Sequence, residues 1–237
     1  MLTVASPIPA LLPLKGHSER VPNKNLRTFA GRPLYHRVAS VLEQSPLVSE
    51  IVVNTDSREI ANDARRNFEK VRIIDRPSSL QGGHVPMEAI VECDLEHLDS
   101  EHFLQTHATS PLLTLETLES AIQTYFSELP DRDSLFTVRE IRQRLYWRDG
   151  SPVNHQPGVV RTQDLEPILV RNACLYVLSR TAFFSAGSSR IGKRPYLFVM
   201  DDVESIDVDE ETDFLIAEAA YLALRKDASC NKGTGAR

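Results

Sequence analysis

The chain has 237 residues, of which 41% are hydrophobic and 25% charged, as in an ordinary globular domain with a proper core. The 33 acidic and 27 basic side chains give a net charge of -6, which argues against a general binder of nucleic acid or of anionic membranes. Any anionic ligand must therefore be held by a local cluster of basic residues.

The cysteines give no sign of a disulfide framework or of a zinc site. Cys93, Cys174 and Cys230 form no C-x-x-C pair, so reduced thiols are expected. The apolar stretch near the N-terminus is too short and too rich in proline for a signal peptide, and no stretch approaches the length of a membrane span. We therefore expect a soluble, cytoplasmic protein.

The first predicted element is a buried strand, because residues 8–14 form the apolar run IPALLPL. A polar loop, KGHSERVPNKN, follows directly over 15–25. Its glycine lets backbone amides approach an anion closely, its serine adds a hydroxyl donor, and its cations can neutralise a polyphosphate. The predicted nucleotide-binding residues of this stretch are Leu14, Lys15, Gly16, Ser18, Arg20, Lys24 and Asn25.

This loop has neither the spacing of a Walker sequence nor that of a dinucleotide fingerprint. A solvated basic loop is the alternative interpretation, and for charge clusters in general it is the more common one. The position of the loop favours binding, because ligands in open α/β sheets bind at the carboxyl ends of strands.

Apolar runs alternate with helical patterns along the rest of the chain. Helices are predicted over 33–42, 57–67, 86–95, 115–129 and 212–226. Strands are predicted over 50–54, 71–75, 103–106, 135–139, 170–178 and 206–208. Asp56 and Glu59 fit a capping box for the second of these helices. The alternation predicts an α/β fold with a doubly wound, mainly parallel sheet.

Between residues 140 and 171 this rhythm changes. Turn chemistry at Asp149-Gly150 and at Gln156-Pro157-Gly158 indicates hairpins or an irregular lobe that leaves the main sheet. We therefore expect a single domain over 1–227 that carries this lobe, followed by a disordered tail over 228–237.

Polar residues follow two further predicted strands. Arg76 comes directly after the strand over 71–75, where a turn with an exposed arginine is the alternative. The sequence QTHATSPL over 105–112 follows the fourth strand, and its Thr-Ser-Pro turn can simply end the strand and cap the next helix. The candidate binding residues there are His107, Thr109 and Ser110.

Two carboxylates alternate along the last predicted strand. Asp207 and Asp209 would point to the same face, about 6.5 to 7 Å apart along the backbone. Hard oxygen ligands beside a polyphosphate favour Mg²⁺ over softer metals. An acidic helix N-terminus is the alternative, since Glu210, Glu211 and Asp213 suit a helix dipole. With a phosphate loop elsewhere in the chain, the metal interpretation is the better one.

The order P-x-K-G-x-S-x-R-x-P-x-K-N over 13–25, followed by G-x-P-L over 31–34, resembles the opening of a known enzyme family. This family comprises the cytidylyltransferases that make CMP-activated acidic sugars, the CMP-sialic acid and CMP-Kdo synthetase group. Further matches run to Ile216, including the family's D-x-D-x-x-x-D-F segment, so the resemblance covers nearly all of the chain.

The resemblance implies roles for individual residues. Arg76 would contact the cytosine base, and Asp207 and Asp209 would bind the catalytic metal. The lobe over 140–171 would clasp a second subunit, so a homodimer is expected. The acceptor-binding residues implied by the family motifs are His107, Thr109, Ser110, Arg161 and Gln163, although the basic residue Arg161 could contribute to the subunit contact instead.

Three positions depart from the family pattern. His107 stands where the family usually has a glutamine that helps to hold the sugar acid. Lys15 replaces an arginine, and the exchange matters because arginine offers a bidentate fork and lysine only a point charge. Glu19 replaces a lysine of many relatives, with Arg20 close enough to compensate. These changes leave the nucleotide site intact and the identity of the acid open.

The resemblance thus implies transfer of CMP from CTP to an acidic 2-keto sugar, with Mg²⁺ as cofactor and with Lys15, Lys24, Asp207 and Asp209 as the catalytic residues. Catalysis would be positioning plus charge neutralisation. Transfer to another small acid such as a phosphonate is an alternative, and so is a non-catalytic nucleotide-binding protein on the same fold. The paired carboxylates speak against the latter, because binding a nucleotide needs no two-carboxylate metal site.

Overall fold

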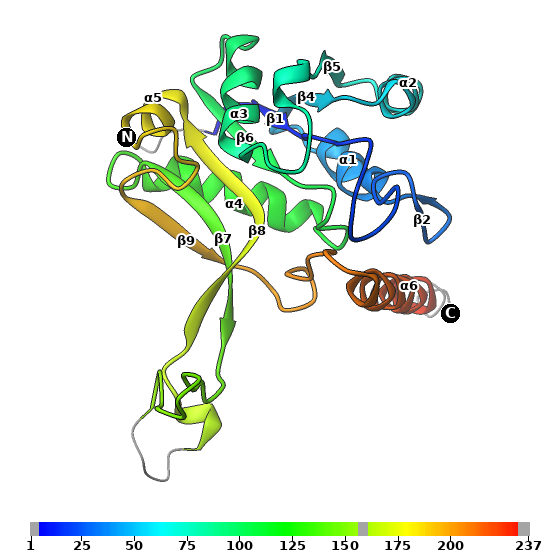
Figure 1. Cartoon of the computed structure of the whole chain (residues 1–237). Helices are drawn as coiled ribbons and strands as arrows, with labels where there is room; N and C mark the ends of the chain where they lie inside the picture. Colours follow the sequence, from blue (N-terminus) through cyan, green and yellow to red (C-terminus); the bar gives the residue numbers. More distant parts are fainter. Residues whose placement is uncertain (1–4, 156–160, 232–237) are drawn as a thin grey trace.

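The computed structural model describes residues 5–155 and 161–231 and centres on a seven-stranded sheet (Figure 1). In sheet order the strands are β5 (Val71–Asp75), β4 (Val48–Thr55), β1 (Ile8–Leu11), β6 (His102–Thr106), β8 (Ile168–Ser179), β7 (Ser134–Ile141) and β9 (Pro195–Val199). Strand β8 runs antiparallel to β6 and β7, whereas the other neighbours in this sheet pair in parallel. The predicted α/β fold with a mainly parallel sheet is confirmed.

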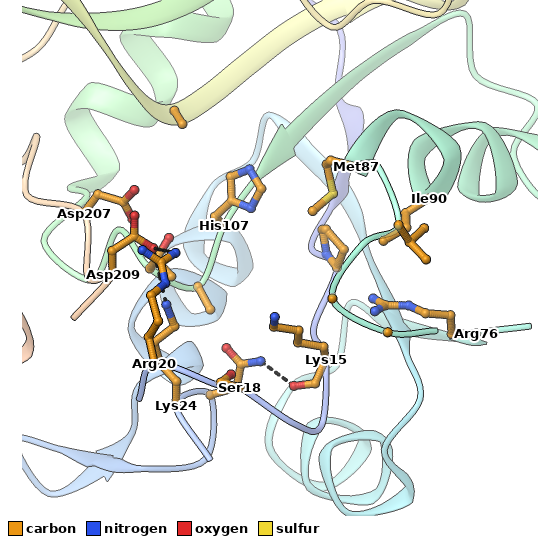
Figure 2. A pocket seen from close by; sticks show the side chains of 18 residues that line it. Lys15, Ser18, Arg20, Lys24, Arg76, Met87, Ile90, His107, Asp207 and Asp209 are labelled. Carbon is orange, nitrogen blue, oxygen red and sulfur yellow. Dashed lines mark hydrogen bonds and ion pairs between the residues drawn. The ribbon is translucent and has the colours of Figure 1, made fainter. Parts of the chain in front are cut away.

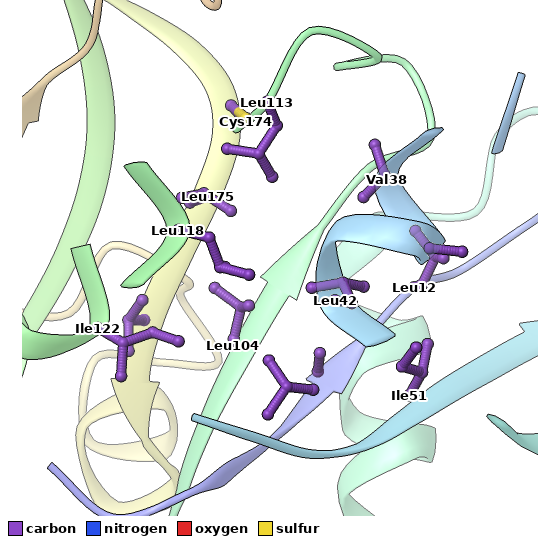
Figure 3. Packing of buried hydrophobic residues seen from close by; sticks show 14 of the residues in the cluster. Leu12, Val38, Leu42, Ile51, Leu104, Leu113, Leu118, Ile122, Cys174 and Leu175 are labelled. Carbon is purple, nitrogen blue, oxygen red and sulfur yellow. The ribbon is translucent and has the colours of Figure 1, made fainter. Parts of the chain in front are cut away.

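Helices cover both faces of the sheet because its central strands are apolar on both sides. Their bounds are α1 (Tyr35–Gln44), α2 (Arg58–Asn67) and α4 (Leu115–Glu128) on one face, and α3 (Met87–Glu96) and α5 (Arg180–Ser185) on the other. On β4, Ile51 and Val53 join the first core and Val52 joins the second, as the two-residue period of a strand requires. Figure 3 shows the first core, where α1 and α4 pack on the strands.

A third core cluster joins the beginning of the chain to its end. Its buried members are Val21, Phe29, Leu34, Leu112, Val208, Phe214 and Ala217. The cluster lies between a small hairpin, β2 (Thr28–Phe29) with β3 (Arg32–Pro33), and the last helix, α6 (Glu211–Asn231). Arg27 reinforces it by donating two hydrogen bonds to Glu211, at 2.5 and 2.7 Å, and by lying over the Phe214 ring. This packing brings the loop over 15–25 next to residues 207–209.

The strand predicted over 206–208 is wrong. Residues 206–209 are irregular, and Val208 donates its backbone N–H to the carbonyl oxygen of Thr109, which lies in a loop. The alternation of polar and apolar residues is present, since Val208 is buried between two aspartates that line a pocket. Alternation alone does not make a strand when the segment packs against loops.

One helix cap and one helix end also differ from expectation. Ser57, rather than Asp56, caps α2 by accepting a hydrogen bond from the backbone N–H of Ile60. Helix α6 extends past Lys226 to Asn231, so residues 228–231 of the expected disordered tail are helical, and residues 232–237 lie outside the described part. No glycine or proline interrupts the chain between Lys226 and Asn231, so no strong helix breaker stops the helix there.

A narrow arm leaves the sheet, as the change of rhythm predicted (Figure 1). Strands β7 and β8 continue past their neighbours as a ribbon that ends in a small lobe with the 3₁₀-helix η2 (Thr162–Asp164). The predicted turn at Asp149-Gly150 closes a short hairpin, in which Tyr146 pairs with Pro152. The predicted turn at 156–158 lies outside the described residues.

Two further expectations concerned the cysteines and membrane-spanning segments. Cys93 and Cys174 are buried and unpaired, while the side chain of Cys230 lies outside that part. Among the helices of residues 5–155 and 161–231, none has the length and apolar character needed to cross a membrane.

Candidate functional site

A pocket of about 370 Å³ opens where β1, β5 and β6 end, with the segment over 207–209 on its far side (Figure 2). This is the edge at which ligands bind in open α/β sheets. The predicted site residues that line it are Lys15, Ser18, Arg20, Lys24, Asn25, Arg76, His107, Thr109, Asp207 and Asp209. The structure therefore brings together residues that are far apart in the sequence.

The loop over 15–25 is held in place by its own polar groups. Asn25 donates its side-chain amide to the carbonyl oxygen of Lys15 at 2.8 Å, which closes the loop. Lys24 is buried and donates from Nζ to the carbonyl oxygen of Val208 at 2.7 Å. Burial lowers the pKa of Lys24, and the carboxylate of Asp209 opposes that effect. The loop is thus tied directly to the opposite wall.

Two predicted nucleotide-binding residues have structural roles instead. Gly16 does not line the pocket, because its N–H donates to Asp56 Oδ1 at 2.7 Å and is not free for an anion. A Cβ atom at this position would lie 2.9 Å from Cβ of Ser57, so close packing explains the glycine. Leu14 is fully buried in the core and extends the pairing of β1 to Thr55.

The two aspartates differ in their surroundings. Asp209 Oδ1 lies 2.7 Å from Arg20 and 3.8 Å from Lys24. Asp207 Oδ1 is buried without a hydrogen-bond partner, and burial together with the nearby charge of Asp209 raises the pKa of Asp207. An orphaned carboxylate oxygen facing other carboxylates is the environment that a bound cation would stabilise.

Metal ligation would be completed by the substrate rather than by the protein. Across the described ranges, no group of three or more histidine, cysteine, aspartate or glutamate side chains is close enough to hold an ion. Asp213 has a structural role, since its Oδ2 accepts the backbone N–H groups of Asp209 and Glu210 at 3.0 and 2.8 Å. Asp213 therefore caps α6.

Arg76 forms a buried wall of the pocket, contrary to the exposed-turn alternative. Its Nε and Nη2 donate to the side-chain and backbone oxygens of Asn54 at 2.8 and 2.7 Å. Asn54 in turn donates to Asp94 Oδ1 at 2.6 Å, deep in the core. Beside Arg76 the lining is apolar, from Val85, Met87 and Ile90. A planar base would find one charged edge and an apolar face here.

At the other end of the pocket, His107 is backed by polar residues that the sequence did not suggest. Gln105 and Arg190 approach its Nε2, at 3.1 and 3.4 Å, and Arg190 is paired with Glu88. Arg190 comes from the loop before β9, which carries no recognisable motif.

A second cavity, of about 440 Å³, adjoins the first and shares Ala173 and Asp207 with it. Arg139 and Arg171 line this cavity, and within the described residues neither side chain has a hydrogen bond or ion pair, although the charge of Arg171 helps to lower the pKa of Glu88. Both were missed from the sequence, although Arg171 directly precedes the matched Asn172 and could have been noticed there. The cavity offers two uncommitted guanidinium groups beside Asp207.

The remaining predicted acceptor residues divide into two groups. Thr109 lines the pocket and hydrogen-bonds to Asp207, whereas Ser110 is buried against the thiol of Cys174 and does not line it. Arg161 and Gln163 lie on the arm, where Arg161 pairs with Asp164 at 2.7 Å. The ribbon of β7 and β8 carries both residues away from the pocket of their own chain (Figure 1).

Comparisons with known proteins agree with this geometry. A family model described as Cytidylyltransferase matches residues 10–196. N-acylneuraminate cytidylyltransferase A of Danio rerio is 28% identical over 224 residues, which cover 91% of this chain and 51% of that protein. Post-translational flagellin modification protein B of Campylobacter coli is 28% identical over 221 residues, or 86% of this chain and 90% of that protein. The chain thus spans about half the length of the first relative.

Solved structures of similar fold include one that covers almost the whole chain. A CMP:2-keto-3-deoxy-manno-octonic acid synthetase complexed with CTP gives a TM-score of 0.66 at 13% identity, covering 93% of this chain and 100% of that one. At so low an identity the likeness concerns the fold alone. The family model, in contrast, spans the sequence from β1 to the start of β9. The chain therefore belongs to the cytidylyltransferase family.

Proposed function

We propose that this chain transfers CMP from CTP to a small acidic sugar and releases pyrophosphate. The observation that carries the proposal is a single pocket in which three cations, Lys15, Arg20 and Lys24, face the carboxylates of Asp207 and Asp209. The names of similar proteins support it. The zebrafish relative is named for an N-acylneuraminate, and the similar structure is of a synthetase for a 2-keto acid, with CTP bound.

The nucleotide would lie between the phosphate loop and Arg76. Lys15, Arg20 and Lys24 supply positive charge for the triphosphate, and Ser18 adds a hydroxyl donor. Within the described residues, Arg76 uses only Nε and Nη2 in hydrogen bonds to protein, so Nη1 is left for the base.

Mg²⁺ is the metal that this site fits best, because its donors are hard carboxylate oxygens. Asp207 and Asp209 would hold the ion together with phosphate oxygens, and Asp207 Oδ1 has no other partner to lose. When bound, such an ion neutralises charge on the phosphates.

The acceptor would lie beside Asp207, between the His107 end of the first pocket and the second cavity. In a 2-keto sugar acid the carboxylate is attached to the carbon that bears the anomeric hydroxyl, so both groups must fit within a few bonds of each other. If that hydroxyl lies beside Asp207, the carboxylate faces Arg139 and Arg171. A guanidinium is suited to a carboxylate, since it can donate two parallel hydrogen bonds.

Transfer would proceed by in-line attack of the anomeric hydroxyl oxygen on the α-phosphorus. The bond from that phosphorus to the bridging oxygen breaks, pyrophosphate leaves with the electron pair, and the hydroxyl proton passes to water. Arg20 and Lys24 would neutralise the leaving group, while Arg139 and Arg171 hold the acceptor in line. The chain thus acts by positioning and electrostatic stabilisation, without a covalent intermediate.

We further propose that the arm clasps a second copy of the chain. Tyr146 and Trp147 on its lobe are 58% and 63% exposed, which is unusual for aromatic side chains unless they meet a partner. Arg161 and Gln163 would then lie at the subunit contact. A cytoplasmic location remains a prediction.

Pyrophosphate release from CTP and Mg²⁺ tests the proposed function. We expect release to require an acid from a panel of N-acetylneuraminic acid, 3-deoxy-manno-octulosonic acid and a phosphono acid, and to fail with ATP, GTP or UTP. Release with the phosphono acid alone would keep cytidylyl transfer and replace the acceptor. No release with any acid would contradict the proposal.

A further inference from the structure

Arg190 connects several side chains behind the acceptor end of the pocket. Its side chain is only 13% exposed, and its Nε donates to Glu88 Oε1 at 3.0 Å. The guanidinium lies 4.6 Å over the ring of Tyr176. Its Nη1 donates to Gln105 Oε1 at 2.8 Å and lies 3.4 Å from Nε2 of His107. A largely buried cation that is paired with Glu88 and Gln105 thus faces Nε2 of His107.

The orientation of the Gln105 amide follows from Arg190, because a guanidinium can donate hydrogen bonds but cannot accept them. Oε1 of Gln105 must therefore face Arg190, which makes Nε2 the donor end. The 2.8 Å bond from this Nε2 to the carbonyl oxygen of Thr106 requires the same orientation. The second hydrogen of the amide is then available to His107 Nε2, at 3.1 Å.

We propose that Arg190 and Gln105 fix His107 as a neutral imidazole with its proton on Nδ1, and that this Nδ1–H is a hydrogen-bond donor to the acceptor substrate. Two donors converge on Nε2, and only an unprotonated nitrogen can accept them. Within the described residues, Nδ1 has no hydrogen-bond partner, and His107 lines the pocket with Asp207 on one side and Met87 on the other (Figure 2). Arg190 is thus a positioning residue.

The loop that carries Arg190 is firmly anchored. Gly192 has a φ of +72°, and a Cβ atom there would lie 2.5 Å from Asp133 Oδ1, so only glycine fits. The Asp133 carboxylate accepts the backbone N–H groups of Lys193 and Arg194 at 3.0 and 2.9 Å. The guanidinium is therefore presented from a fixed backbone.

The charges around His107 also keep its ring neutral. Burial is the largest effect, and the cations of Arg190 and Lys24 add to it, so that the pKa of His107 falls to about 4 although Glu88 opposes the change. The neutral donor therefore persists at every physiological pH.

With its proton on Nδ1, His107 favours substrates that place an oxygen atom next to this nitrogen. The ligand assignment rests on the proposed function, which supplies an acidic sugar rich in hydroxyl, carbonyl and carboxylate oxygens. A substrate that placed an amine there would meet a second donor and be rejected, since two donors cannot pair.

Long-range ¹H–¹⁵N correlation spectra of the ¹⁵N-labelled protein report which ring nitrogen carries the proton. The His107 signals are assigned by their loss in His107→Gln. We expect a proton on Nδ1 and no titration from about pH 6 to about pH 8. A proton on Nε2, or a charged ring within this range, would overturn the proposal, and the wild-type protein alone decides this.

Variants of the same loop test the role of Arg190. In Arg190→Gln the proton of His107 should no longer be confined to Nδ1. The KM of the acid should rise about 3- to 10-fold, which corresponds to one ordinary hydrogen bond, and the KM of CTP should stay unchanged. The matched control is Arg194→Gln, which loses a bond to Pro130 and should leave the spectrum as it is. An unaltered spectrum in Arg190→Gln would refute the positioning role. Because the spectra need no substrate, absent turnover would count only against the proposed function.

Discussion

The two ends of the pocket are built in different ways. The nucleotide end consists of loops that follow parallel strands, and its cations Lys15 and Arg20 are exposed to solvent. The acceptor end is built against the antiparallel strand β8 and the loop before β9, and its cation Arg190 is buried and paired with Glu88. Asp207 lies between the two ends and borders both cavities.

This difference indicates two uses of positive charge. Exposed cations lose little hydration free energy in the folded protein, so they are suited to bind a triphosphate and to release it. An arginine that is largely buried and paired with Glu88 is less available to a ligand, so its proposed role is to orient its neighbour His107. Arg139 and Arg171 lie at the acceptor end but resemble the exposed cations, because their side chains form no ion pair with another described residue.

The largest effect is expected where the two ends meet. Asp207→Asn and Asp209→Asn keep size and polarity but remove a charge from the proposed metal site. Each should lower kcat by orders of magnitude, since metal stabilisation is worth several kcal/mol and each 1.36 kcal/mol is about tenfold in rate. Melting should confirm that both variants remain folded, because one fewer carboxylate relieves repulsion. Near-normal Mg²⁺-dependent turnover in both would show that the metal lies elsewhere.

The acceptor end should respond separately from the nucleotide end. Arg171→Gln removes a guanidinium from the second cavity and should raise the KM of the acid about 10- to 100-fold, the worth of a charge-assisted hydrogen bond. The KM of CTP should change little. Arg65→Gln, at an exposed position of α2, is the control for loss of one positive charge. Equal effects of Arg171→Gln on both substrates would mean that the two ends are not distinct.

Behind the nucleotide end, Asn54 connects Arg76 to the buried carboxyl group of Asp94. The ionisation of Asp94 should make the stability of the fold depend on pH. Burial raises the pKa of Asp94 from 3.8 to about 7. Such a group stabilises the fold below its unfolded pKa, and this stability is lost as the pH rises towards 7. The Tm of Asp94→Asn relative to wild type should therefore increase between about pH 4 and about pH 7. Parallel Tm curves across that range would argue against a carboxyl group that ionises with difficulty.

The smallest effect is expected at Asp213, which caps α6 and borders the second cavity. Asp213→Asn should cost about 1 kcal/mol of stability, as the loss of a helix cap does, which lowers Tm by about 2–4 °C. Turnover should stay close to that of the wild type. A loss of turnover like that of Asp207→Asn would instead make Asp213 a metal ligand.

The nucleotide end could be predicted from the sequence because its parts are local. The strand over 71–75 has the predicted bounds, and Arg76 follows it directly. The loop over 15–25 follows the first strand in the same way, and parallel strands bring such ends to one edge. Even here the partner of the Gly16 N–H could not be predicted, since nothing local in the sequence shows that Asp56 accepts its hydrogen bond.

The acceptor end could not be predicted, because its contacts are non-local. Arg190 lies 102 residues from Glu88 and 85 from Gln105, and no spacing rule links positions so far apart. Arg161 and Gln163 were expected at the pocket, but the length of the ribbon that carries them away depends on how far β7 and β8 pair. In residues 206–208, polar and apolar residues alternate as in a strand, but the segment packs against loops and is irregular, which the local pattern does not show.

Thermal melting with nucleotides tests the central claim most directly, namely that this pocket is a CTP site. Ligand at a hundred times its Kd stabilises the native state by about 2.7 kcal/mol, or about 5–11 °C for a chain of this size. With Mg²⁺ present, CTP should raise Tm by this amount, while ATP, GTP and UTP at the same concentration should raise it far less. Equal shifts with all four nucleotides would contradict the account and leave a site that recognises only a triphosphate.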